Sequence, residues 1–181
     1  RDDVFSSLHS NEIDNLKIFD EHSIPKLETV LRMFPDMKFQ IDVKTDEVAM
    51  PALAIIQKNN AMDRVCIASF NSKRLNLVNN NYPDICISMG PYEVAKMLLS
   101  SFGLYKKSIL GNCLQIPIYE YGIKLVTKRF VKFIHSKGLK VCVWTINDEK
   151  TFKYLIDIGV DGIITDKPKL LFEVLDSTTN Q

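Results

Sequence analysis

Residues 140–168 read KVCVWTINDEKTFKYLIDIGVDGIITDKP and predict one complete strand–helix–strand unit. Residues 141–145 are β-forming and too few for a helix, whereas residues 149–158 place apolar side chains at helical spacing. Gly159 follows as the expected left-handed end of that helix, where a Cβ would clash. Residues 160–165 are apolar without alternation, as in a strand covered on both faces. The stretch therefore predicts a parallel sheet.

The same stretch and several strings upstream carry a family resemblance. VWTIND at 143–148 and GVDGIITDKP at 159–168 are similar to the C-terminal end of the glycerophosphodiester phosphodiesterase family. Further strings match in the family's order, so that the resemblance covers residues 24–175. The upstream strings are IPKLETVL at 24–31, FQIDVK at 39–44, RVCIASF at 64–70 and LQIP at 114–117. The resemblance implies an α/β fold, a TIM (β/α)8 barrel of the PLC-like phosphodiesterase type.

Six βα units are predicted along the chain. A complete barrel has eight strands and about 250 residues, so a chain of 181 residues would lack about the first two units. The missing units are placed at the N-terminus, because the chain ends with the family's last strand. Strands are predicted at 38–43, 65–69, 85–89, 113–116, 141–145 and 160–165, and helices at 24–34, 48–60, 71–78, within 92–112, at 128–137, at 149–158 and from 168.

One barrel domain is expected between two short segments. Residues 1–23 predict a loop-rich lead-in, the remnant of an insertion before the second helix, with a short helix over 12–19. Residues 24–175 form the barrel, and residues 176–181 a polar, frayed tail. Without the first two units, the first and last predicted strands have unpaired edges, which invite pairing with another chain. The side chains expected to meet water inside the open barrel are Ile41, Val43, Ile163 and Ile164.

The composition is that of an ordinary globular domain. The chain is 46% hydrophobic and 25% charged, and 23 basic against 22 acidic residues give a formal net charge of +1. Because the charges are spread along the chain, neither nucleic acid nor an anionic membrane is expected as a partner. No apolar run approaches the about 18 residues that span a bilayer, so no transmembrane segment is expected. We expect a cytoplasmic location, and the sequence leaves open a signal peptide upstream of Arg1.

Four cysteines fall within four successive predicted strands. They are widely spaced without a CxxC pair, which argues against a zinc site and gives no disulfide framework. Cys142 lies two positions before Trp144, and Cys113 lies two positions before Gln115, so each pair points to the same face of its strand. We therefore expect the cysteines to face the barrel interior as one layer of small side chains. All four are expected to be reduced, buried and unreactive. They are Cys66, Cys86, Cys113 and Cys142.

Asp42 and Lys44 are the first candidates for chemistry. In a barrel of this type the chemistry lies at the C-terminal ends of the strands. Two residues apart on a strand, the carboxylate and the ammonium point to the same face, into the barrel mouth. The spacing alone is equally compatible with a structural salt bridge. A charge pair in an apolar interior is costly without a task, which favours a functional site.

The family resemblance implies a role for each of these residues. It implies that Asp42 ligates a divalent cation, Ca2+ or Mg2+, and that Lys44 contacts the substrate phosphate. The family more often has glutamate at the position of Asp42, so this chain departs modestly from the pattern. Trp144, Phe70 and Gln115 are expected to line the pocket, with a core role open for the tryptophan. The carboxylates expected to cap helices are Asp148 and Asp166.

No catalytic acid or base is expected within this chain. In the family, paired histidines come from a His-Arg-Gly motif on the first strand and a His-Asp motif after the second. Neither motif occurs here, and the Glu-Asn-Thr stretch and a further acidic metal ligand are absent too. His135 lies on a predicted outer helix, and His9 and His22 lie in the lead-in. We therefore interpret all three histidines as surface or structural residues.

The resemblance implies a phosphoric diester hydrolase of lipid and glycerol metabolism. Such an enzyme would bind a glycerophosphodiester as its substrate and hydrolyse it to glycerol 3-phosphate and an alcohol. One alternative is a non-catalytic remnant or split-gene fragment that acts only as a scaffold or interaction module. Another is a related barrel phosphodiesterase that acts on phospholipids. Further expected partners are a complementing N-terminal segment or a second copy paired through the open edges.

Overall fold

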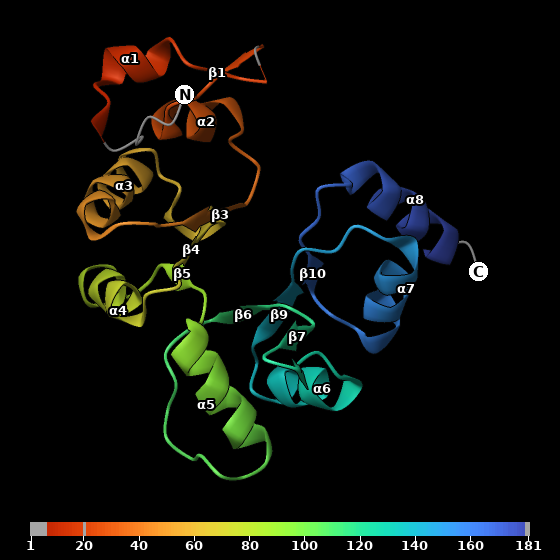
Figure 1. Cartoon of the computed structure of the whole chain (residues 1–181). Helices are drawn as coiled ribbons and strands as arrows, with labels where there is room; N and C mark the ends of the chain where they lie inside the picture. The colour runs from red at the N-terminus through yellow and green to blue at the C-terminus, as the bar shows by residue number, and fades with distance from the viewer. Residues whose placement is uncertain (1–6, 20, 180–181) are drawn as a thin grey trace.

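The computed structural model describes residues 7–19 and 21–179, and its centre is a set of six parallel strands (Figure 1). They form two three-stranded sheets with the orders β3-β4-β5 and β10-β9-β6. Every pairing within them is parallel, as the continuous apolar strands predicted. The strands are β3 (Phe39–Asp42), β4 (Val65–Ala68), β5 (Cys86–Ile87), β6 (Cys113–Ile116), β9 (Lys140–Val143) and β10 (Gly162–Ile163). All six lie within, or within one residue of, the predicted strands.

The two sheets meet at a seam between β5 and β6. Ser88 and Cys113 form an isolated parallel bridge there. The Met89 amide donates to the Cys113 carbonyl at 2.8 Å, and the Asn112 amide donates to the Ile87 carbonyl at 2.8 Å. Gly111, just before this contact, has a φ of 128°, and a Cβ there would lie 2.5 Å from Cγ of Met89. The seam therefore requires glycine, and it joins the strands in the order β3-β4-β5-β6-β9-β10.

Helices follow the strands and lie outside them (Figure 1). Their ends follow local chemistry. The side chains of Asn71, Thr127 and Asp148 accept hydrogen bonds from the first turns of three helices. Gly159 ends α7 with a φ of 80°, as predicted. The helices are α2 (Leu27–Met33), α3 (Asp46–Lys58), α4 (Ser72–Asn81), α5 (Pro91–Ser101), α6 (Lys128–Ser136), α7 (Glu149–Ile158) and α8 (Pro168–Thr179), with a 3-10 turn at Met62–Arg64.

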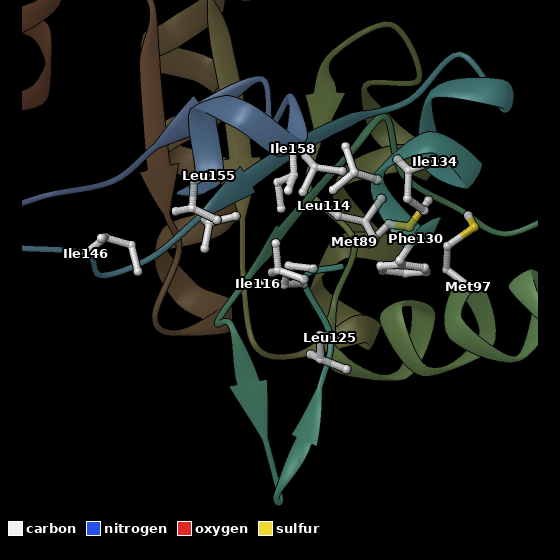
Figure 2. Close-up of a cluster of buried hydrophobic side chains, with 14 of the residues drawn as sticks. Met89, Met97, Leu114, Ile116, Leu125, Phe130, Ile134, Ile146, Leu155 and Ile158 are labelled. Atoms are coloured by element: carbon white, nitrogen blue, oxygen red, sulfur yellow. The ribbon is translucent and has the colours of Figure 1, made fainter. Parts of the chain in front are cut away.

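Two hydrophobic clusters fill the space between strands and helices. One packs strand residues such as Ile67 against Leu53 and Ile56 of α3. The other packs strand residues such as Leu114 against residues of α5, α6 and α7 (Figure 2). Alternate strand residues supply these clusters, and Phe152 is the largest fully buried side chain. Burying one large apolar side chain fully contributes roughly 1.5–3 kcal/mol to the free energy of folding. The two clusters therefore hold the helix layer against the strands.

The opposite face of the strands is concave. Gln40 Nε2 on β3 donates to Gln115 Oε1 on β6, although β4 and β5 separate these strands. The sulfurs of Cys66 and Cys113 lie 3.7 Å apart across β5. In a flat sheet, side chains two or three strands apart would be about 10–14 Å apart. The strands therefore curve around a common interior, with helices outside, which is the α/β architecture of the TIM-barrel type.

Several details differ from the sequence predictions. Ile41, Val43 and Ile163 pack against the helix-facing clusters, so the prediction that they face the barrel interior is wrong. Only Cys113 is buried among the four free cysteines and the other three are half-buried, so the prediction that all four are buried is wrong for three of them. Residues 176–179 continue α8 instead of forming a separate tail, and residues 180–181 lie outside the described residues.

The lead-in also folds differently from its prediction. The predicted helix over 12–19 is replaced by α1 (Ser10–Asp14) and an antiparallel pair, β1 (Lys17–Ile18) with β2 (His22–Ser23). Residues 1–6 and 20 lie outside the described residues. A second short hairpin, β7 (Tyr119–Glu120) with β8 (Ile123–Lys124), was not predicted. In the part of the chain that is described, no helix has the length and apolarity to cross a membrane.

A carboxylate links the N-terminal ends of β9 and β10. Asp161 accepts hydrogen bonds from His135 Nε2 at 2.8 Å, from the Val141 amide at 2.9 Å and from Lys140 Nζ at 3.0 Å. Burial acts to raise the pKa of Asp161, but hydrogen bonds from Val141, His135 and Lys140 outweigh it and lower the pKa below its ordinary value. His135 thus ties α6 to this end of the strands.

The lowered pKa predicts an acid-sensitive contribution to stability. A carboxyl group whose pKa is lower in the folded state stabilises the fold. This stabilisation is fully present at pH values above the pKa in the unfolded state, about 3.9, and is lost as the pH falls through the pKa in the folded state. We expect Asp161→Asn to lower the free energy of unfolding by about 1–2 kcal/mol at neutral pH and by less at about pH 3. Urea denaturation at both pH values measures this, with the exposed Asp157→Asn as control. An equal loss at both pH values would contradict the assignment.

Candidate functional site

Asp42 and Lys44 lie at the C-terminal end of β3 and form an ion pair. The Lys44 side chain is 71% exposed and the Asp42 side chain 31% exposed. The expectation that this pair lies in an apolar interior is therefore wrong, because the concave face opens to solvent at the strand ends. An exposed ion pair contributes only about 0–1 kcal/mol. The fold does not depend on this pair, and either group can exchange its partner at little cost.

Two aromatic side chains extend the contact across the mouth. Lys44 Nζ lies 5.6 Å from the centroid of the Phe70 ring. The Phe70 ring meets Trp144 edge-on, with centroids 6.2 Å apart and ring planes at 82°. Phe70 follows β4 and Trp144 follows β9, so these residues come from strands that are not neighbours. The structure thus brings together four of the five predicted site residues.

Gln115 lies apart from these four residues, deeper in the interior. Its side-chain oxygen accepts from Gln40, which precedes Asp42 by two positions on the same face of β3. Its side-chain nitrogen lies 3.9 Å from the sulfurs of Cys66 and Cys113. Gln115 therefore belongs to the layer below the mouth.

The backbone between Asp42 and Lys44 is held by a residue that sequence reasoning missed. Arg74 on α4 donates to the Val43 carbonyl at 2.7 Å, to Ser69 Oγ at 2.8 Å and to Asp46 Oδ1 at 2.7 Å. Its side chain is only 10% exposed. Ser69 Oγ also donates to the Val43 carbonyl at 3.0 Å. No sequence motif marks Arg74, because its partners lie on other elements, 5 to 31 positions away.

A second network orders the loops after β9 and β10. Asn147 Oδ1 accepts from the Asp166 amide at 2.9 Å and from Thr165 Oγ1 at 3.0 Å, and Asn147 Nδ2 donates to Asp166 Oδ2 at 2.9 Å. Asp148 caps α7 through the Thr151 amide at 2.9 Å, as predicted, and this backbone hydrogen bond lowers the pKa of Asp148. The Asp166 carboxylate pairs with Asn147.

Asp42 fits a divalent metal ion as one ligand. A carboxylate oxygen is the donor that Ca2+ and Mg2+ prefer, and these ions take about six to eight and about six ligands, respectively. Among residues 7–19 and 21–179, one group of three or more His, Cys, Asp or Glu side chains could hold a metal ion, and it consists of Cys66, Cys86 and Cys113. Thiols are poor ligands for hard cations. Asp42 could therefore serve such an ion only together with ligands from outside this group.

Comparison with known proteins assigns the family. Residues 3–170 match the glycerophosphoryl diester phosphodiesterase family, and the chain belongs to this family. Its members generally depend on a divalent metal ion. The chain is 33% identical over 162 residues to "Probable glycerophosphodiester phosphodiesterase 2" of Mycobacterium tuberculosis, covering 84% of this chain and 60% of the relative. The chain thus spans about three fifths of that relative's length.

Solved structures show the same fold. A glycerophosphodiester phosphodiesterase from Parabacteroides distasonis superimposes with a TM-score of 0.75 at 21% identity, covering 96% of this chain and 73% of that one. A phosphodiesterase from Oleispira antarctica, in complex with the product sn-glycerol-3-phosphate, superimposes with a TM-score of 0.66 at 19% identity, covering 85% of this chain and 62% of that one. At these identities the likeness concerns the fold.

The Arg74 network predicts a large loss of stability on substitution. Arg74→Met keeps the length of the side chain but removes every donor, so the buried Val43 carbonyl loses a charged partner. We expect the free energy of unfolding to fall by about 2–3 kcal/mol. Arg129→Met is the matched control, because Arg129 is exposed and makes only weak contacts, a hydrogen bond of 3.4 Å to the Ser101 carbonyl and a cation–π contact 5.0 Å from the Phe102 ring centroid. Urea denaturation of both variants measures the difference, and equal stabilities would contradict the role of Arg74.

Proposed function

We propose that the protein containing this chain hydrolyses a glycerophosphodiester to glycerol 3-phosphate and an alcohol. The family match over residues 3–170 carries this proposal. The arrangement at the mouth supports it, because a carboxylate, an ammonium and two aromatic rings meet where strands β3, β4 and β9 end. In barrels of this type, the strand ends are where catalysis takes place.

In this proposal Asp42 provides one ligand for a divalent cation, Ca2+ or Mg2+, and Lys44 binds the substrate phosphate. When bound, such a cation neutralises charge on phosphate oxygens. The ion pair of Lys44 with Asp42 and its contact with Phe70 are each worth only about 1 kcal/mol or less at exposed positions. Lys44 can therefore turn to a phosphate once Asp42 faces a cation. Phe70 and Trp144 form a wall of the pocket, and Gln115 supports it from below.

The acid and base are proposed to come from outside these 181 residues. His135 pairs with Asp161 at the N-terminal ends of the strands, the end opposite to Asp42. Among the described residues β3 and β10 each have one strand neighbour and do not pair with each other. We propose that about two further βα units complete the barrel between them and bring the catalytic histidines. The alternative is a scaffold or interaction module without catalysis.

The proposed roles predict the effect of two substitutions. In the protein that includes the completing βα units, Asp42→Ala should lower divalent-dependent turnover of glycerophosphocholine by about 100-fold or more, and Lys44→Ala by a similar factor. The reason is that the negative charge of the substrate phosphate is no longer compensated, by the cation in the first variant and by the ammonium group in the second. Steady-state kinetics with Mg2+ and Ca2+ titrations measures this.

An exposed ion pair on the outer helices supplies the control. Asp157 and Lys128 lie 3.9 Å apart, and their alanine variants should keep wild-type activity. Unchanged turnover and metal dependence in Asp42→Ala would refute the metal role. Faster turnover of a lysophospholipid than of glycerophosphocholine would favour the alternative of a phospholipid-directed enzyme.

The 181-residue chain alone is expected to be inactive and prone to associate. The outer edges of β3 and β10 carry backbone groups that can pair with another chain. Supplying the completing βα units as a separate chain should raise solubility, sharpen thermal unfolding and restore metal-dependent activity together. Light scattering, calorimetry and activity assays test this. A monomeric, cooperatively folded chain that hydrolyses glycerophosphocholine by itself would show that no completing segment is needed.

A further inference from the structure

Three cysteine side chains converge inside the concave face, one layer below the mouth. Cys66, Cys86 and Cys113 come from β4, β5 and β6, and their sulfur atoms all lie within 4.8 Å of one another. All three are free thiols; Cys113 is buried and the other two are half-buried. A small solute can therefore reach the cluster from the concave face.

The spacing of the sulfurs fits a single thiophilic cation. At a Zn–S bond length of about 2.3 Å, two sulfur ligands of a tetrahedral site lie about 3.8 Å apart. Cys66 and Cys113 already lie at 3.7 Å. The longest separation in the cluster needs to shorten by about 1 Å, which a modest turn of one cysteine side chain provides.

A side-chain amide donor faces the cysteine sulfurs. Gln115 Nε2 lies within hydrogen-bonding distance of two of the sulfurs, at 3.9 Å from each, and its amide is oriented by Gln40. Donors of this kind stabilise negative charge on sulfur. The Gln115 amide can therefore hold negative charge on these two sulfurs when a cation binds.

We propose that Cys66, Cys86 and Cys113 form a binding site for one Zn2+ ion, with a water molecule as the fourth ligand. Three thiolates suit a soft or borderline cation and discriminate against Mg2+ and Ca2+, which prefer oxygen ligands. The site is therefore chemically distinct from Asp42. The sequence spacing of 20 and 27 positions between these cysteines argues against a zinc site. The curvature of the strands nevertheless brings their sulfurs together.

The bound ion would act on the weakest junction of the strand layer. Cys86 and Cys113 lie on either side of the seam between β5 and β6, where a single bridge joins the two sheets. A metal bonded to both residues and to β4 links the sheets from the concave side. The predicted role of the zinc ion is structural, because the residues proposed to bind substrate lie at the mouth, one layer above the cysteines.

Metal titration of the reduced chain tests the site. The metal-free 181-residue chain, kept at a concentration at which light scattering shows no association, is titrated with Zn2+ in excess Mg2+, and separately with Co2+, whose thiolate complexes absorb in the near ultraviolet. We expect one equivalent of Zn2+ to bind, the thiolate–cobalt band to appear, and Zn2+ to raise the thermal unfolding temperature. Serine at any one of the three positions should weaken Zn2+ binding by at least about tenfold.

Two matched variants and a labelling experiment complete the test. Cys142→Ser, on the neighbouring strand β9, and Asp42→Asn, at the mouth, should both bind Zn2+ like the wild type. In the unmodified chain, Zn2+ should protect Cys66, Cys86 and Cys113 from iodoacetamide but leave the rate at Cys142 unchanged, so the result does not depend on variants that fail to fold. Equal labelling with and without Zn2+, or binding that survives all three serine substitutions, would overturn the proposal.

Discussion

The seam between β5 and β6 is the contact on which the rest of the structure depends. Within the described residues, one bridge between Ser88 and Cys113 and the flanking hydrogen bonds of Met89 and Asn112 join the two three-stranded sheets. Because Gly111 lets the chain approach Met89 closely, the second sheet can continue the curve of the first. Every contact across the concave face follows from this curvature, from the glutamine pair to the aromatic pair at the mouth.

The mouth combines a hydrogen-bonded backbone with exposed side chains. Arg74 holds the Val43 carbonyl with a buried, charged hydrogen bond, and β3 is extended by the bond from the Val43 amide to the Ala68 carbonyl at 2.8 Å. The side chains of Asp42 and Lys44 on either side are exposed and bound to each other weakly. Such an arrangement suits a site whose charged groups must change partners when a cation and a phosphate arrive, while the strand end beneath them stays in place.

The concave face is divided into two layers of different chemistry. Hard oxygen and ammonium groups lie at the strand ends, whereas thiols and amides lie one residue pair deeper. Under the two proposals made above, oxygen ligands at the mouth would select a hard divalent cation and the thiols below it would select a thiophilic cation. The glutamine pair belongs to the deeper layer, since Gln40 is in register with Cys66 and Gln115 contacts the sulfurs.

The sequence by itself determined the six parallel strands, the helices that follow them, the family, and the shared face of Asp42 and Lys44. Strands, helices and the caps at Asp148 and Gly159 depend on interactions within a few residues, which a local pattern records. The short hairpins were not predicted, because a strand of two residues has too few positions to show an alternation of apolar and polar side chains. Only the tertiary structure decided that Phe70 meets Trp144, that Arg74 holds Val43 and that three cysteines converge. These contacts join residues on separate elements, and the curvature that brings them together is a property of the whole strand layer rather than of any segment.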